Sequence, residues 1–85
     1  MFNCNLAYRF APNPHESAGF LEGFSGCGFT RKSAQENAIM KINLKLDILK
    51  QPFEESRVIE KGKLTKQEMF LLRSDWKTSQ RSQIV

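Results

Sequence analysis

Hydrophobic and polar residues alternate through the first ten positions of the chain. The apolar or aromatic residues at the even positions are Phe2, Cys4, Leu6, Tyr8 and Phe10. Alternation with a period of two and a high aromatic content is typical of a half-buried β-strand. The next segment, APNPHES at residues 11–17, combines two prolines with Asn and Ser. We therefore predict a strand over the first ten residues and a turn after it.

A second strand is predicted over residues 17–24, where Phe20 and Phe24 supply the apolar content. The proline-containing turn would pair it antiparallel with the first strand. Gly19 and Gly23 lie in the same segment. Glycine inside a strand either weakens the strand or marks a bulge, so the strand is expected to be irregular at these two positions.

The apolar spacing changes to three or four residues after residue 30, which predicts an amphipathic helix facing the sheet. The residues of this stripe are Ala34, Ala38, Ile39, Ile42, Leu46 and Leu49. Thr30 and Ser33 can each cap the start of the helix. The sequence SAQE at residues 33–36 also matches a capping box, in which Glu36 would bond back to the Ser33 amide.

Residues 42–49, INLKLDIL, allow two interpretations, because they alternate as a strand does and also continue the helical stripe. The helix either runs to about Lys50, or it stops near Lys41 and gives way to a strand. We favour the long helix, because no Gly, Pro or Asn-Gly interrupts residues 41–43. Pro52 then ends the element.

The last third of the chain predicts a short strand or turn around Arg57–Glu60, followed by a helix over residues 66–79. Thr65 and Glu68 have the spacing of a second capping box, and Leu64 is placed to pack against Met69. The inner stripe of this helix consists of Met69, Leu72 and Trp76, supported by Phe70. Residues 81–85 are expected to form a disordered tail.

These elements predict an α+β fold: a small antiparallel β-hairpin packed against a helix, in the order β-β-α, followed by a second, C-terminal amphipathic helix. Residues 1–80 would form one domain. The predicted core consists of Leu6, Tyr8, Phe20, Phe24, Ile39, Ile42, Leu46, Met69 and Leu72. A two-stranded sheet leaves unpaired amides on both edges, so we also expect a homodimer.

Composition restricts the function more than the fold. The chain has 85 residues, of which 40% are hydrophobic and 26% charged, as in ordinary globular domains. Its net charge of +4 suits an anionic partner such as nucleic acid. The N-terminal residues lack the pattern of a signal peptide, and no run of 18 apolar residues occurs. We therefore expect a cytoplasmic protein with reduced cysteines.

Catalytic and metal-binding chemistry has few candidate residues. Cys4, Cys27 and His15 are the only thiols and imidazole, and a tetrahedral zinc site needs four such ligands. A nucleophile also needs an adjacent base, and the one histidine lies in the proline-containing turn. We therefore expect a binding protein without enzymatic activity, cofactor or metal.

The segment SGCGFTRKSAQENA, Ser25 to Ala38, is the best candidate for a binding site. A helix N-terminus presents unpaired amides and the positive end of the helix dipole, both of which attract phosphate. Arg31 and Lys32 would lie in the first helical turn, where cations oppose the dipole at a cost of a few tenths of a kcal/mol. Cations at an unfavourable position point to an anionic partner.

This segment resembles the C-terminal half of the double-stranded RNA-binding domain, where the last strand leads into the second helix. The residues in register with that family's motif are Gly26, Gly28, Thr30, Arg31, Lys32, Ala34 and Ala38, whereas Gln35 and Asn37 replace a Lys and an Ala. The resemblance implies that Arg31 and Lys32 bind phosphates across the major groove of duplex RNA. The nucleic-acid-binding set is then Gly26, Gly28, Thr30, Arg31, Lys32 and Gln35.

The C-terminal helix provides a rival hypothesis. Trp76 lies on its apolar stripe, and Arg73 and Lys77 lie on the opposite, basic side of the helix. Exposed aromatic residues of this kind anchor protein–protein interfaces. The chain would then be an adaptor or inhibitor that acts by covering the surface of another protein, as many small proteins of phages and mobile elements do. The sequence leaves RNA, DNA and protein open as targets.

Overall fold

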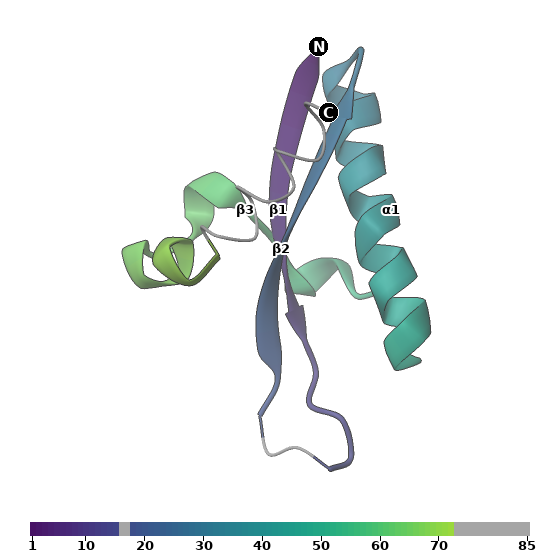
Figure 1. Cartoon of the computed structure of the whole chain (residues 1–85), viewed down its shortest axis with the longest axis vertical. Coiled ribbons are helices and arrows are strands. Elements are labelled where there is room, and N and C mark those ends of the chain that lie inside the picture. The colour runs from purple at the N-terminus through teal and green to yellow at the C-terminus, as the bar shows by residue number, and fades with distance from the viewer. Residues whose placement is uncertain (16–17, 73–85) are drawn as a thin grey trace.

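The computed structural model of the chain describes residues 1–15 and 18–72. Its elements are the strands β1 (Phe2–Phe10) and β2 (Phe20–Gly28), the helix α1 (Arg31–Leu49) and the strand β3 (Val58–Glu60), with 3₁₀ turns η1 (Glu55–Arg57) and η2 (Lys61–Lys63) on either side of β3. A second helix is described over residues 66–72. Figure 1 shows the long hairpin between α1 on one side and the C-terminal elements on the other. The predicted α+β fold and its element order are confirmed.

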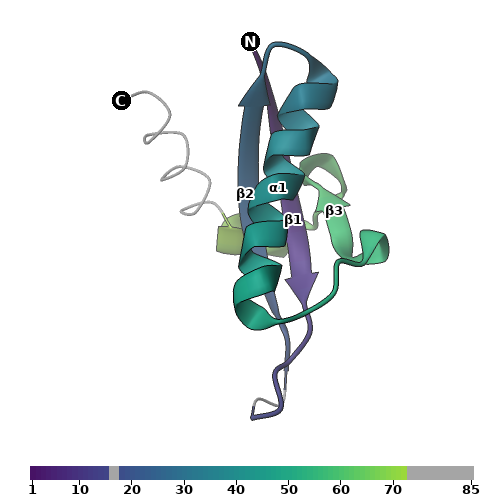
Figure 2. The same cartoon turned by 90° about the vertical axis from the view of Figure 1, so that its right-hand side faces the viewer.

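The sheet has three antiparallel strands in the order β2-β1-β3, which Figure 2 shows behind α1. β1 pairs with β2 from Phe2 opposite Gly28 to Phe10 opposite Phe20. The predicted bounds of the second strand, 17–24, were wrong, because β1 offers a pairing partner to every residue as far as Gly28. Gly23 lies opposite Ala7 in unbroken register, so it marks no bulge.

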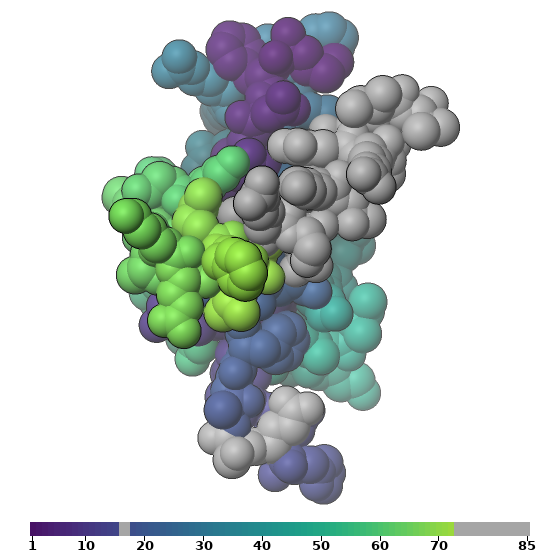
Figure 3. Space-filling view, turned by 60° about the vertical axis from the view of Figure 1, so that its left-hand side comes forward, coloured from purple at the N-terminus to yellow at the C-terminus, as the bar shows by residue number. Residues whose placement is uncertain are grey.

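β1 is covered on both faces by different elements. Leu6, Tyr8 and Phe10 face α1, where they pack against buried side chains of the helix. Ala7 lies on the other face, buried against Leu72 of the second helix. The green lobe in Figure 3, formed by the C-terminal elements, lies over this second face. The chain therefore builds three layers, with the sheet in the middle.

Residues 42–49 belong to α1, so the long helix is confirmed and the strand alternative is wrong. The buried residues of the helix are Ala34, Ala38, Ile42 and Leu46, four residues apart. Leu44 and Ile48, which a strand would have buried with them, are exposed. The helix ends at Lys50, which takes the left-handed conformation with φ 56°, two residues before Pro52.

Thr30, one of the two predicted caps, is confirmed at the start of α1, but the capping box there is not the predicted one. Thr30 is the N-cap, and Ser33 completes the capping box: the Ser33 amide donates to Thr30 Oγ1 at 3.0 Å and the Thr30 amide donates to Ser33 Oγ at 3.0 Å. The predicted box between Ser33 and Glu36 was wrong, because β2 reaches Gly28 and the helix follows it after two residues. The predicted box at the second helix is confirmed, with Thr65 and Glu68 bonded reciprocally at 3.0 and 3.2 Å.

Thr30→Ala should lower the free energy of unfolding by about 1 kcal/mol, because the Ser33 amide loses its acceptor. Glu36→Ala, which removes the side-chain acceptor that a Ser33–Glu36 box would need, should leave it unchanged within about 0.5 kcal/mol, as expected for an exposed residue outside the box. Urea denaturation of the two variants beside the wild type measures both values. Equal destabilisation by the two changes would contradict the Thr30–Ser33 box.

The predicted core is largely confirmed. Leu6, Tyr8, Ile42, Leu46 and Leu72 are buried, and Phe24, Ile39 and Met69 pack partly buried against them. Phe20 was wrongly placed in the core: it is 39% exposed, because it opens β2 at the end of the hairpin. Its ring stacks on the buried Phe10, with the centroids 4.8 Å apart.

Candidate nucleic-acid interface

Gly26 and Gly28 of the candidate segment lie where β2 approaches α1 most closely. A Cβ atom on Gly26 would collide with the backbone of Ala34 and Ala38, and one on Gly28 would come within 2.8 Å of the Ala34 amide nitrogen. Neither glycine has a positive φ. Packing between strand and helix thus accounts for both glycines, and it needs no ligand to do so.

The polar residues of the candidate segment lie at the surface. Thr30, Arg31, Lys32 and Gln35 line the start of α1 with little or no burial, and the first turn of the helix contains no acidic residue. The Arg31 guanidinium lies 5.7 Å from the centroid of the Phe2 ring, a cation–π contact that tethers it to the end of β1. Among the described residues, no carboxylate forms an ion pair with Arg31 or Lys32, so their charge stays available.

Several other cations of the described residues are compensated by neighbouring carboxylates. Ion pairs join Arg9 to Glu68 at 3.3 Å, Lys45 to Glu22 at 3.9 Å and Lys63 to Glu60 at 4.0 Å, and Arg57 pairs with Glu54. Hydrogen bonds from the Thr65 amide and hydroxyl, helped by Arg9, hold the pKa of Glu68 below its ordinary value. Arg31 and Lys32 at the start of α1 differ from these cations, because neither forms an ion pair with a described carboxylate.

Two exposed aromatic residues beside these cations were not predicted as part of the site. Phe29 is 85% exposed in the turn between β2 and α1, and Phe2 is 43% exposed. Phe29 falls outside both the strand alternation and the helical stripe, and this position is the signal that could have identified it. An exposed ring next to two cations can stack on a base while the cations bind phosphates.

A hollow of about 530 Å³ lies next to this surface, along the N-terminal half of β1. Arg31 and Gln35 line it from α1, Phe2 and Asn3 from β1, and Gly62 from η2. It brings two of the predicted nucleic-acid-binding residues to the side of a strand that is distant from them in sequence. The other four predicted residues do not line it.

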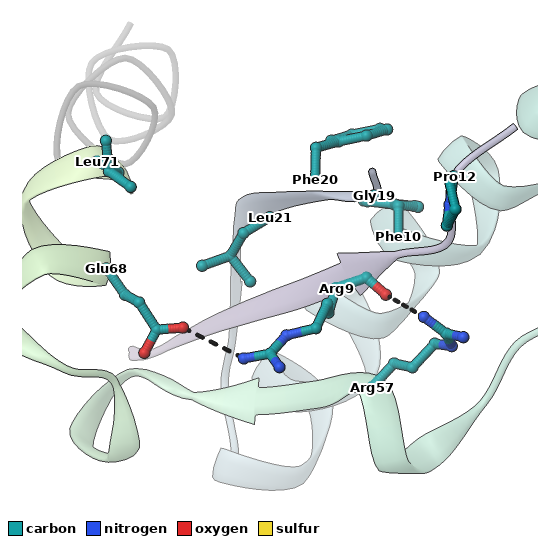
Figure 4. Close-up of a pocket in the computed structure, with 9 residues that line it drawn as sticks. All are labelled: Arg9, Phe10, Pro12, Gly19, Phe20, Leu21, Arg57, Glu68 and Leu71. Carbon is teal, nitrogen blue, oxygen red and sulfur yellow. Dashed lines mark hydrogen bonds and ion pairs between the residues drawn. The ribbon is translucent and has the colours of Figure 1, made fainter. Parts of the chain in front are cut away.

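A second hollow, of about 450 Å³, lies at the other end of the hairpin and is shown in Figure 4. Phe20, Leu21 and Leu71 give it an apolar wall. The Arg9–Glu68 ion pair and the hydrogen bond from Arg57 Nη1 to the Arg9 carbonyl at 3.0 Å close its opposite side. The predicted partner-binding residues Arg73, Trp76 and Lys77 lie outside the described residues.

Cys4 and Cys27 are free thiols, and burial together with the nearby Glu60 carboxylate raises the pKa of Cys4. His15 is exposed in the turn. Within residues 1–15 and 18–72, no three His, Cys, Asp or Glu side chains are grouped so that they could hold a metal ion. No helix of that part of the chain has the length and apolarity to cross a membrane.

Comparisons of the chain with models of protein families, with curated proteins and with solved structures give no match. The resemblance to the double-stranded RNA-binding domain therefore stays a prediction.

Proposed function

We propose that the protein binds nucleic acid, without catalysis, through the surface at the start of α1 that consists of Phe29, Thr30, Arg31, Lys32 and Gln35. The observation that carries the proposal is the pair of cations, Arg31 and Lys32, in a helical turn that has no acidic residue and no ion-pair partner among the described residues. Phosphate is the anion that such a turn binds best, because amides, dipole and side chains all act on it.

Two features of the surface support different forms of nucleic acid. The resemblance to the double-stranded RNA-binding domain supports duplex RNA, with Arg31 and Lys32 on its phosphates. The exposed ring of Phe29 supports a single strand, since a paired base cannot stack on it without leaving the duplex. We put duplex RNA first, because Arg31 and Lys32, which carry the proposal, belong to the motif of the double-stranded RNA-binding domain, whereas Phe29 does not.

A fluorescence-anisotropy titration tests the proposal. The wild-type protein is titrated onto a 20-base-pair RNA duplex, one of its strands and the matching DNA duplex, each over a series of salt concentrations. We expect binding whose affinity falls as salt rises, with the RNA duplex bound at least as tightly as the others. Binding of none of the three at low salt would exclude the function.

A protein partner is the second candidate, and it is favoured by the apolar surface around the hollow in Figure 4. Phe70 and Leu71 of the second helix are exposed, as is Phe20 of β2. Exposed apolar side chains around a hollow are typical of a protein-docking surface. The function would then be that of an adaptor or inhibitor.

Leu71→Asp should abolish the capture of such a partner, because the apolar wall of the hollow would lose a side chain and the new carboxylate would have to give up its hydration in the complex. Gln67→Asp adds the same charge to an exposed position of the same helix and should retain the partner. The measurement is a pull-down from nuclease-treated lysate. A protein captured equally by both variants would place its binding surface elsewhere, and capture lost on nuclease treatment would favour nucleic acid.

A further inference from the structure

The edges of the sheet differ in how well they are covered. The outer edge of β2 is covered by α1: Asn37 Nδ2 donates to the Cys27 carbonyl at 2.6 Å and Lys41 Nζ donates to the Ser25 carbonyl at 2.6 Å. These side chains occupy carbonyls that another strand would need. The expectation that both edges of the hairpin are open is therefore corrected for this edge.

Among the described residues, the strand that pairs with the other side of β1 covers it only in part. β3 pairs with β1 from Leu6 to Tyr8, and the chain then turns away through η2. No strand of the described residues pairs with Phe2–Asn5 on this side. The hollow of about 530 Å³ lies beside these residues, and Glu60 at the end of β3 also lines it. In Figure 3 this end of β1, in purple, emerges beyond the green lobe.

The hydrogen bonds show which residues of β1 direct their backbone toward this open side. Opposite residues of an antiparallel pair direct their N–H and C=O groups either toward each other or away from each other, in alternation. The Cys27 carbonyl accepts a bond from α1, and Cys27 lies opposite Asn3, so Asn3 directs its backbone away from β2. Arg9 lies an even number of residues from Asn3 and so directs its backbone to the same side. Its carbonyl accepts a hydrogen bond from Arg57, which lies on the β3 side.

We infer that the open side of β1 is an interface between two copies of this chain, which join their sheets antiparallel about a twofold axis at Asn3. The exposed apolar residues at this edge favour a second copy: Met1 is 81% and Phe2 43% exposed, and pairing would cover both. An exposed apolar edge is the usual site of strand pairing between chains.

The register of the pairing follows from the position of β3. Residues that direct their backbone outward must face each other, so Asn3 can lie opposite Met1, Asn3 or Asn5 of the second copy. The pairing of Asn3 with Met1 would join residues 1–3 alone. The pairing of Asn3 with Asn5 would bring Phe2 opposite Leu6, where Glu60 of β3 already lies. The register centred on Asn3 keeps residues 2–4 of the second copy clear of Glu60, and it places Phe2 opposite Cys4 of the second copy.

A twofold axis perpendicular to the sheet keeps α1 of both copies on the same face. Arg31 lies over Phe2, next to the axis, so the cations at the start of α1 in the two copies would form one continuous basic surface. The dimer does not depend on the proposed function, but it would double the charge of the proposed binding surface.

Phe2→Cys tests the register. In the joined sheet, the introduced thiol of one copy would face the native Cys4 of the other as a non-hydrogen-bonded pair, with Cα atoms about 4.5 Å apart, within the range of a disulfide. Mild oxidation should convert Phe2→Cys largely to a covalent dimer on a non-reducing gel. The control Phe2→Cys/Cys4→Ser, which retains Cys27, should give a small fraction of that dimer. Equal cross-linking of the two would overturn the register.

Sedimentation equilibrium of the unmodified protein at micromolar concentration tests the interface itself, with twice the 9.8 kDa of one chain as the expected mass. Asn3→Pro removes only an outward amide, as an edge strand tolerates, and should give the mass of one chain with an unchanged circular dichroism spectrum. A wild-type protein that stays at the mass of one chain would overturn the inference. A dimer that Asn3→Pro leaves intact while the spectrum is unchanged would overturn it as well.

Discussion

Replacing Arg31 and Lys32 with Ala should weaken binding to a 20-base-pair RNA duplex and flatten the dependence of log affinity on log salt by roughly two units. Each phosphate contact contributes a slope of about 0.9 for B-form DNA, which serves as a guide for RNA, and the variant loses two contacts. The loss should be uniform across duplex sequences, because phosphates carry no sequence information. Anisotropy titrations over a series of salt concentrations give both quantities.

The matched control is Lys63→Ala/Lys66→Ala. It also removes two positive charges, from exposed positions in η2 and at the start of the second helix. The net charge therefore changes by the same amount, and α1 stays unchanged. It should retain most of the affinity and the slope of the wild type. Both variants should stay folded, with free energies of unfolding within about 1 kcal/mol of the wild type. The Arg31/Lys32 variant loses an unfavourable dipole contact together with a cation–π contact. The control changes exposed side chains only. If the two variants weaken binding equally, the charge acts as a whole and the surface at α1 is not the site.

Gly26→Ala should be the most damaging single change, with a loss of about 3 kcal/mol or more in the free energy of unfolding. The new methyl group would collide with the backbone of Ala34 and Ala38, which lie in the middle of a buried helix–strand contact. Backbone cannot move aside as a flexible side chain can, so α1 would have to shift away from β2. Such a shift would open the contact that also buries Ile42 and Leu46.

Gly62→Ala is the control for this prediction, because a Cβ atom on Gly62 meets nothing within 4 Å and no glycine of the described residues has a positive φ. It should change the free energy of unfolding by less than about 0.5 kcal/mol, or increase it slightly by restricting the unfolded chain. Urea denaturation with circular dichroism detection measures both variants. A Gly26→Ala protein as stable as Gly62→Ala would show that strand and helix do not pack this closely.

The local pattern of the sequence was enough to predict the elements that depend on near neighbours. The alternation of residues 2–10 predicted β1, and the four-residue spacing of the apolar side chains predicted α1 to its last turn. The capping box of Thr65 and Glu68 followed from their spacing alone. Each of these features depends on contacts between residues a few positions apart, and such contacts can be predicted from the spacing of residues in the sequence.

The candidate site was predicted only in part. The surface position of Arg31 and Lys32 follows from their place in the first turn of an amphipathic helix. The role of Gly26 and Gly28 was not predictable, because a glycine is needed both where the backbone approaches a ligand and where it approaches a helix of its own chain. The sequence does not distinguish these two cases.

The sequence by itself determined the order and type of the elements, the stripe of α1 and the positive charge at its start. Only the tertiary structure decided that β2 runs on to Gly28 and that β1 is also buried at Ala7 on its second face. It also decided that side chains of α1 bind carbonyls on one sheet edge, while no described strand pairs with Phe2–Asn5 on the other. Strand register and edge coverage arise from groups far apart in the chain, such as Cys27 with Asn37 or Ala7 with Leu72. Their pairing depends on how whole elements pack, and no local pattern contains it.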